Sequence, residues 1–135
     1  MTDSGESAFR IDRAMINRRI EGLAISADLK ALLASLLDTT IEIGGKLVDL
    51  GARIVAFVLE FARAYPGVAF GVAAALVLSF LIGAIPVVGP LLTPFLTPLL
   101  LIIGIGLGAL DDLTDGGMLV RLKGLQGQLN GAGVA

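Results

Sequence analysis

The chain has 135 residues, of which 56% are hydrophobic and only 16% are charged, and its formal net charge is −2 at pH 7. A soluble domain of this size normally has about 25% charged residues, because its surface is large relative to its volume. The sequence contains no Cys, His or Trp, which excludes disulfide scaffolds, Cys/His zinc sites, thiol catalysis and Ser-His-Asp catalysis. The charge balance provides no basic surface for nucleic acid, so we expect no nucleic-acid partner.

The N-terminal residues 1–25 are predicted to form a tail followed by a short amphipathic helix. Ser7 is a candidate N-cap for this helix, and Gly22 is a candidate stop. The helix is rich in arginine, with Arg10, Arg13, Arg18 and Arg19. These side chains either contact anionic lipid headgroups, remain in solvent or bridge two subunits.

Residues 26–64 are predicted to form one long amphipathic helix, which Ser26 caps and Gly44-Gly45 kinks. Large apolar side chains recur there at alternating spacings of four and three, which is typical of a coiled-coil or bundle seam. The seam consists of Leu29, Leu33, Leu36, Ile43, Leu47, Leu50, Ile54, Phe57 and Phe61, with Thr40 as its polar member. An apolar stripe of this length needs a partner, so we expect a cyclic homo-oligomer that uses the seam.

Residues 64–110 contain no Asp, Glu, Lys or Arg. One straight helix of that length would extend roughly 70 Å, whereas the hydrocarbon core of a bilayer is about 30 Å thick. Two spans joined by a turn fit this thickness, and the prolines and glycine of residues 85–90 provide the turn. We therefore predict a transmembrane helical hairpin over residues 65–110, with spans at about 66–85 and 91–110.

The competing interpretation of this block is a buried hydrophobic hairpin inside a helical bundle. That arrangement requires amphipathic helices on all sides of the hairpin, and only residues 1–63 precede the block, so the membrane hairpin is preferred. A third span over residues 47–65 is disfavoured because four charged residues lie in it, namely Asp49, Arg53, Glu60 and Arg63. Each would cost about 2.5–3.5 kcal/mol at the bilayer centre.

The distribution of basic residues predicts the orientation of the hairpin. Lys and Arg occur before the first span and, as Arg121 and Lys123, after the second, but not in the turn. The positive-inside rule then places both termini in the cytoplasm, with the protein integral to a bacterial-type inner membrane. Residues 111–135 are expected to form a short amphipathic segment and a flexible tail on that same side.

Small residues recur every four positions in the first span, at Gly67, Gly71, Ala75, Ser79 and Gly83. The second span contains a further pair at the same spacing, Gly104 and Gly108. Strips of small residues let helix backbones approach closely in lipid, where burial from water no longer drives association. The strips either pack the two spans against each other or join neighbouring subunits, and the two roles are compatible.

Two polar patterns suggest further roles. Thr93 and Thr97 each precede a proline, so they would line a pore, or else satisfy the carbonyls of a kinked helix. Asp111, Asp112 and Asp115 follow the second span. They would form a cation site at the mouth of an oligomer, or a solvated turn in which Asp115 caps the next helix.

The sequence thus predicts an all-α integral membrane protein, a two-span helical hairpin with N-terminal amphipathic, coiled-coil-like cytoplasmic helices. The expected function is non-enzymatic: a structural or membrane-organising role through homo-oligomerisation, with membrane lipid as a partner and no cofactor. One alternative is an oligomeric pore or ion channel, and a second is an accessory subunit of a larger membrane complex. An enzyme is disfavoured because no acid, base, nucleophile or metal set clusters in the sequence.

Overall fold

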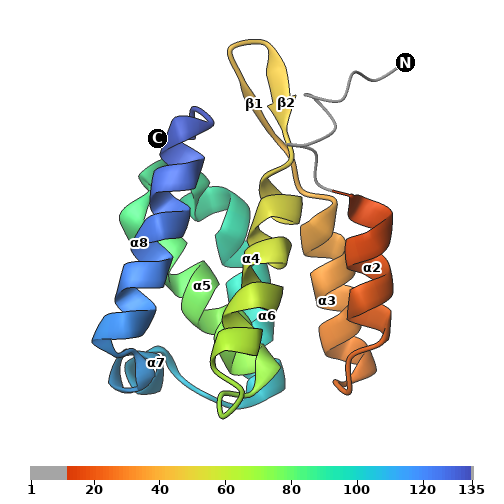
Figure 1. Ribbon diagram of the computed structural model, residues 1–135, viewed down its shortest axis with the longest axis vertical. Coiled ribbons are helices and arrows are strands. Elements are labelled where there is room, and N and C mark those ends of the chain that lie inside the picture. The colour runs from red at the N-terminus through yellow and green to blue at the C-terminus, as the bar shows by residue number, and fades with distance from the viewer. Residues whose placement is uncertain (1–11, 135) are drawn as a thin grey trace.

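The computed structural model describes residues 12–134, which are mostly helical (Figure 1). The α-helices are α2 (Arg13–Glu21), α3 (Ala27–Leu37), α4 (Leu50–Ala64), α5 (Phe70–Ala84), α6 (Gly89–Ile103), α7 (Leu107–Leu113) and α8 (Gly116–Gly131). The other elements are the 3-10 helix η1 (Pro86–Val88) and the strands β1 (Ile41–Ile43) and β2 (Lys46–Val48). The predicted helical class is therefore confirmed, apart from one short β-hairpin.

α2 and α3 form the N-terminal helical pair. α2 ends at Gly22 as predicted, and Asp12 caps its start by accepting a hydrogen bond from Met15 N at 3.1 Å. Ser26 caps α3 by accepting a hydrogen bond from Leu29 N at 3.2 Å, which confirms the predicted start. The predicted cap Ser7 and the arginine at position 10 lie outside the described residues.

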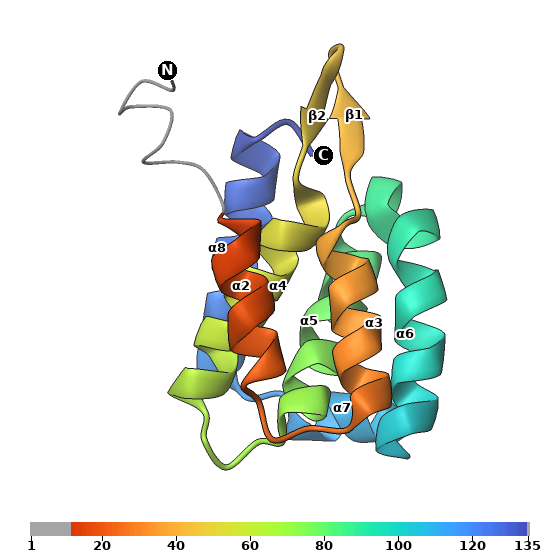
Figure 2. The same cartoon turned by 90° about the vertical axis from the view of Figure 1, so that its right-hand side faces the viewer.

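The single helix predicted over residues 26–64 is wrong. The chain leaves α3 and forms the antiparallel β1–β2 hairpin, in which Ile43 pairs with Lys46 across Gly44 and Gly45. Both glycines have positive φ, 60° and 82°, as a tight two-residue hairpin turn requires. Residues 39–43 before them are rich in Thr and Ile, which favour strands. The hairpin projects beyond the helices (Figures 1 and 2).

α5 is the central helix of the bundle. Figure 2 shows it between α6 and α8, and α4 and α7 also pack against it. All residues from Gly71 to Leu78 are buried, so the helix is covered around its whole circumference. A helix that is apolar on every side needs such a cover, or a membrane, to be stable. The wrapped arrangement that sequence reasoning disfavoured is therefore the environment of α5.

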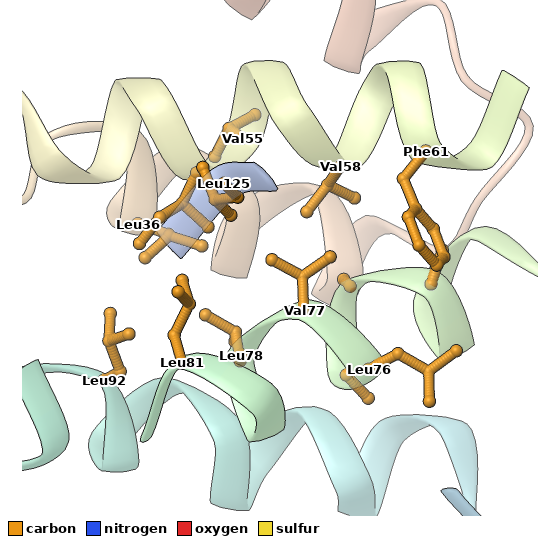
Figure 3. Close-up of a cluster of buried hydrophobic side chains, with 14 of the residues drawn as sticks. Leu36, Val55, Val58, Phe61, Leu76, Val77, Leu78, Leu81, Leu92 and Leu125 are labelled. Carbon is orange, nitrogen blue, oxygen red and sulfur yellow. The ribbon is translucent and has the colours of Figure 1, made fainter. Parts of the chain in front are cut away.

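Side chains from several helices meet around α5 (Figure 3). Val77 of α5 points toward Val58 of α4, and Leu36 of α3 and Leu125 of α8 enter the same cluster. Within residues 12–134, no polar or charged residue is buried in this core. The core is thus held by apolar burial, at about 25 cal/mol for each Å² removed from water.

Both predicted spans are shorter than expected. α5 begins at Phe70 because the chain turns at Pro66, where Val68 N donates to Tyr65 O at 3.0 Å. α6 ends because Gly104 adopts a left-handed conformation, with φ of 71°. Each helix has 15 residues and a length of about 22 Å, less than the thickness of a bilayer core.

The turn between the two helices lies at residues 85–90 as predicted. Among the described residues, only Pro86–Ile103, which joins η1 to α6, is both long and apolar enough to cross a membrane. The structure therefore supports one candidate membrane helix, and the finer prediction of two spans is not established by it.

α7 and α8 complete the bundle. Residues 107–110, predicted as the end of the second span, belong to α7 instead. The Oδ1 atom of Asp115 accepts a hydrogen bond from Met118 N at 2.7 Å, so Asp115 caps α8 as expected. The segment predicted as a flexible tail is helical up to Gly131, and Val134 is buried.

Candidate membrane-contact surface

α6 presents an uncharged face to the outside of the bundle. Its inner face packs through Leu92, Leu96 and Leu99, which are all buried. Its outer face is exposed and consists of Pro90, Thr93, Pro94, Thr97 and Leu101. Leu101 is 80% exposed, and α6 lies at the edge of the bundle in Figure 2. Within residues 12–134, no other element thus covers this side of the apolar helix.

Apolar side chains extend this outer face at both ends of α6. Val87 in η1 is exposed before it, and Leu107 and Leu113 in α7 are exposed after it. A groove of about 600 Å³ opens beside the end of α6, between the α2–α3 loop and the start of α5. Phe70 and Ile103 are among its lining residues, none of which is charged.

Thr93 and Thr97 lie on the outer face of α6, away from the core. The hydroxyl of Thr93 donates to the carbonyl oxygen of Gly89 at 2.7 Å, while Pro94 and Pro98 lie inside a continuous helix. This bond to the carbonyl four residues earlier is common for a helical threonine, whereas the carbonyls that lose a donor to Pro94 and Pro98 are those of Pro90 and Pro94. The predicted role in satisfying freed carbonyls therefore stays a prediction. A role in lining a pore concerns several copies of the chain and stays a prediction.

The first part of the small-residue strip packs inside the single chain. A Cβ added at Gly71 would lie 2.5 Å from Cγ2 of Ile103 and 3.4 Å from Cδ2 of Leu29. Gly71 therefore lets α5 approach α6 and α3 closely, and Ala75 is also buried. Gly71 and Ala75 thus pack within one chain, which is one of the two roles weighed for the strip.

The remaining small residues do not share one surface. Ser79 and Gly83 line a cleft of about 400 Å³ beneath α7 and α8. Gly67 lies in the exposed turn before α5. Gly104 and Gly108 are exposed, and a Cβ added at either would meet no atom within 4 Å. Contacts of these residues between subunits stay a prediction.

Most side chains of the predicted oligomer seam are buried within the single chain. Its buried members are Leu29, Leu33, Leu36, Leu50, Ile54 and Phe61. Thr40, Ile43 and Phe57 are half-buried. Leu47 is 74% exposed on the β-hairpin, away from the others. The seam is therefore wrong as a continuous interface, because α3 and α4 fold back and cover it with each other.

The three aspartates after α6 do not form a metal site in the single chain. Asp111, Asp112 and Asp115 are all exposed. Across residues 12–134, no group of three acidic or other ligating side chains is placed to hold a metal ion. A cation site built from several subunits stays a prediction.

Two arginines of α2 are engaged inside the bundle. Arg13 Nη2 donates to Leu37 O at 2.9 Å and lies 3.9 Å from Asp49. Arg19 lies 3.6 Å from Glu60 of α4. These partly exposed ion pairs are each worth about 0–1 kcal/mol, and they fasten α2 to α4. Arg13 and Arg19 thus make contacts within the chain, and the predicted contact with lipid or another subunit stays a prediction.

Sequence reasoning misses Gly51. Its N–H donates to the carbonyl oxygen of Thr39 at 2.8 Å, and a Cβ at this position would overlap the carbonyl oxygen of Leu36. Gly51 is therefore the residue that lets α4 approach α3 closely. Its signal in the sequence is a lone glycine within an otherwise apolar helical stretch, which commonly has a packing reason.

Comparison of the chain with protein-family models, curated proteins and solved structures finds no match. Function therefore has to be inferred from the surface and the core of this molecule. The outer face of α6 is the feature that the fold itself leaves unexplained.

Proposed function

We propose that the protein binds a lipid bilayer through α6 and assembles there as a non-enzymatic structural or membrane-organising protein. The observation that supports this proposal is the uncharged outer face of α6, which the bundle leaves open. A helix face in contact with water normally carries charged side chains. This face carries none, so its chemistry matches hydrocarbon better than water.

The α6 face needs no change of fold to contact lipid, because it is already exposed. With η1 it forms an apolar element of 18 residues, or about 27 Å at 1.5 Å per residue. Entry of α5 beside it would complete a hairpin with both ends on one side of the membrane. The positive-inside rule assigns that side to the cytoplasm of a bacterial-type cell.

Assembly is proposed to use the outer face of α6, which the described part of the chain leaves uncovered. Because α3 and α4 cover the seam, the outer face of α6 takes over the predicted role in homo-oligomerisation. Thr93, Thr97 and the prolines beside them form a narrow row that permits close contact between two such helices. An accessory subunit of a larger membrane complex would offer the same row to a different protein.

Vesicle flotation tests the membrane contact directly. We expect the protein to float with phospholipid vesicles, and Leu101→Asp to weaken this binding about ten- to hundred-fold, because a buried carboxylate is costly in hydrocarbon. Leu47→Asp is the matched control, since Leu47 is 74% and Leu101 80% exposed, on different elements. Thermal unfolding should show that both variants keep the fold.

Two outcomes would contradict the proposal. One is that the unmodified protein fails to float. The other is that both aspartate variants lose binding equally, since contact would then not be centred on α6. The mass in mild detergent tests assembly: a closed multiple of the chain mass supports homo-oligomerisation, whereas a monomer leaves only the accessory role.

A pore is the second candidate, because Thr93 and Thr97 point out of the bundle and not into its core. A ring of α6 helices with this row turned inward would place hydroxyl groups along a channel. We then expect ion flux through vesicles that contain the protein, and a loss of flux in Thr93→Leu/Thr97→Leu. No flux from a well-defined oligomer in vesicles would exclude the pore.

A further inference from the structure

α8 is a cover of α5 that has little helix-forming tendency of its own. Its 16 residues include five glycines, Gly116, Gly117, Gly124, Gly127 and Gly131. Glycine in a helix interior is less favourable than alanine because it loses more backbone freedom on folding. A Cβ added at Gly124 or Gly127 would meet no atom within 4 Å, so close packing does not require these glycines.

α8 is also attached to the bundle by few kinds of contact. It buries Met118, Leu122, Leu125 and Leu129. Among residues 12–134, the salt bridges join α2 to α4 or lie within α4, and none involves α8. Its charged contact is a cation–π interaction, in which the guanidinium of Arg121 lies 5.6 Å from the centre of the Tyr65 ring.

The packing beneath α8 is incomplete. The cleft of about 400 Å³ lies between α5 and the α7–α8 segment, and Leu76 and Phe80 of α5 line it together with Leu122 of α8. It is open to the outside, because Gly83 and Asp111 in its lining are exposed, so α5 and α8 lack contacts with each other there. Removal of α8 therefore gives up less packing than its length suggests.

α4, the neighbouring cover of α5, is held differently. It buries eight residues along 15, and Arg19 of α2 pairs with its Glu60. The chain between α6 and α7, in contrast, contains Gly104 at φ 71° and Gly106. A glycine-containing connection thus leads into α7–α8, whereas α4 is held by more buried side chains and an ion pair.

We propose that α7–α8 is a releasable strap that covers α5 until α6 has bound a bilayer. This inference rests on the proposed membrane contact of α6. Release of the strap exposes Leu76 and Phe80 to hydrocarbon, which replaces α8 against α5, so that this side of α5 enters the membrane beside α6 while α4 stays packed on the other side. The glycines of α8 set how readily this second step occurs, and they leave the first step, binding by α6, unchanged.

The test strengthens the strap without touching α5 or α6. Gly124→Ala/Gly127→Ala should stabilise α8 in the closed bundle and slow the entry of α5 roughly five-fold per substitution, about 25-fold in total. Gly67→Ala is the matched control, because Gly67 is equally open but lies in the turn before α5. Flotation measures the first step, and amide hydrogen exchange of α5 and α8 on vesicles measures the second.

The expected result for the unmodified protein is that α8 loses protection on vesicles while α2 to α4 keep theirs. The alanine variant should float equally well but lose α8 protection more slowly than the control. If the unmodified protein does not float, the membrane contact itself is wrong. If it floats but α8 stays protected, or the alanine variant opens as fast as Gly67→Ala, the strap is wrong. A variant that is no more stable to heat also overturns the assigned role of the glycines.

Discussion

The contact between α3 and α4 predicts opposite effects for one chemical change at two helical glycines. In Gly51→Ala, the new methyl group overlaps the carbonyl oxygen of Leu36, a backbone atom that cannot rotate away. Overpacking of this kind costs about 1–3 kcal/mol or more, and alanine recovers about 1 kcal/mol of helix propensity. Because the obstacle is backbone, and because moving α4 away would also stretch the 2.8 Å hydrogen bond from Gly51 N to Thr39 O, we expect a net loss of about 2 kcal/mol.

Gly124→Ala is the matched control, since it lies inside α8 and its new methyl group meets no atom within 4 Å. We expect it to gain about 1 kcal/mol. Thermal unfolding followed by circular dichroism should then show a midpoint about 6 °C lower for Gly51→Ala and about 3 °C higher for Gly124→Ala. Equal stabilisation of both variants would refute the close approach of α4 to α3.

Three further substitutions test the fold by the same unfolding measurement. Gly44→Ala should lower the free energy of unfolding by about 1–2 kcal/mol, because φ is 60° at this position. A gain in stability would instead support the continuous helix. Leu78→Ala should lower the free energy of unfolding by about 2–5 kcal/mol, because this α5 side chain is only 1% exposed. A loss below about 0.5 kcal/mol would contradict the central place of α5. Asp115→Ala should lower the free energy of unfolding by about 1 kcal/mol, because it removes the N-cap of α8. Asp112→Ala is the control and should change the stability little. Equal effects of the two substitutions would contradict the assigned cap.

Local signals predicted several element boundaries correctly. Ser26 starts α3, Gly22 stops α2, Asp115 starts α8, and the proline-rich turn at residues 85–90 separates α5 from α6. Each of these depends on one side chain or one ring and the backbone next to it. Such features can be found without any knowledge of tertiary contacts.

The heptad spacing misled because periodicity does not state whether a stripe is continuous. Leu36 and Leu50 fit one seam in the sequence, yet they belong to helices on either side of a hairpin. The positive φ values at Gly44 and Gly45 form a turn there and end any continuous helix. Two adjacent glycines are compatible with a kink in a helix, but they are also a strong signal for a tight hairpin turn.

The candidate surface was predicted in part. Absence of charge in residues 64–110 correctly marked an unusual block, but it could not distinguish α5, which other helices cover, from α6, which is open on one side. That distinction depends on how α7 and α8 return over α5. Their sequence carries a weak amphipathic pattern interrupted by glycines, so it gave little indication of a cover.

The membrane contact of α6 is tested most directly by the depth of a single fluorophore. The chain contains no Trp, so Leu101→Trp on the outer face of α6 and Leu47→Trp on the β-hairpin each introduce one indole group at a similarly exposed position. With vesicles of brominated lipid, we predict strong quenching and a blue shift for Leu101→Trp and little change for Leu47→Trp. Quenching of neither variant, or equal quenching of both, would contradict binding through α6.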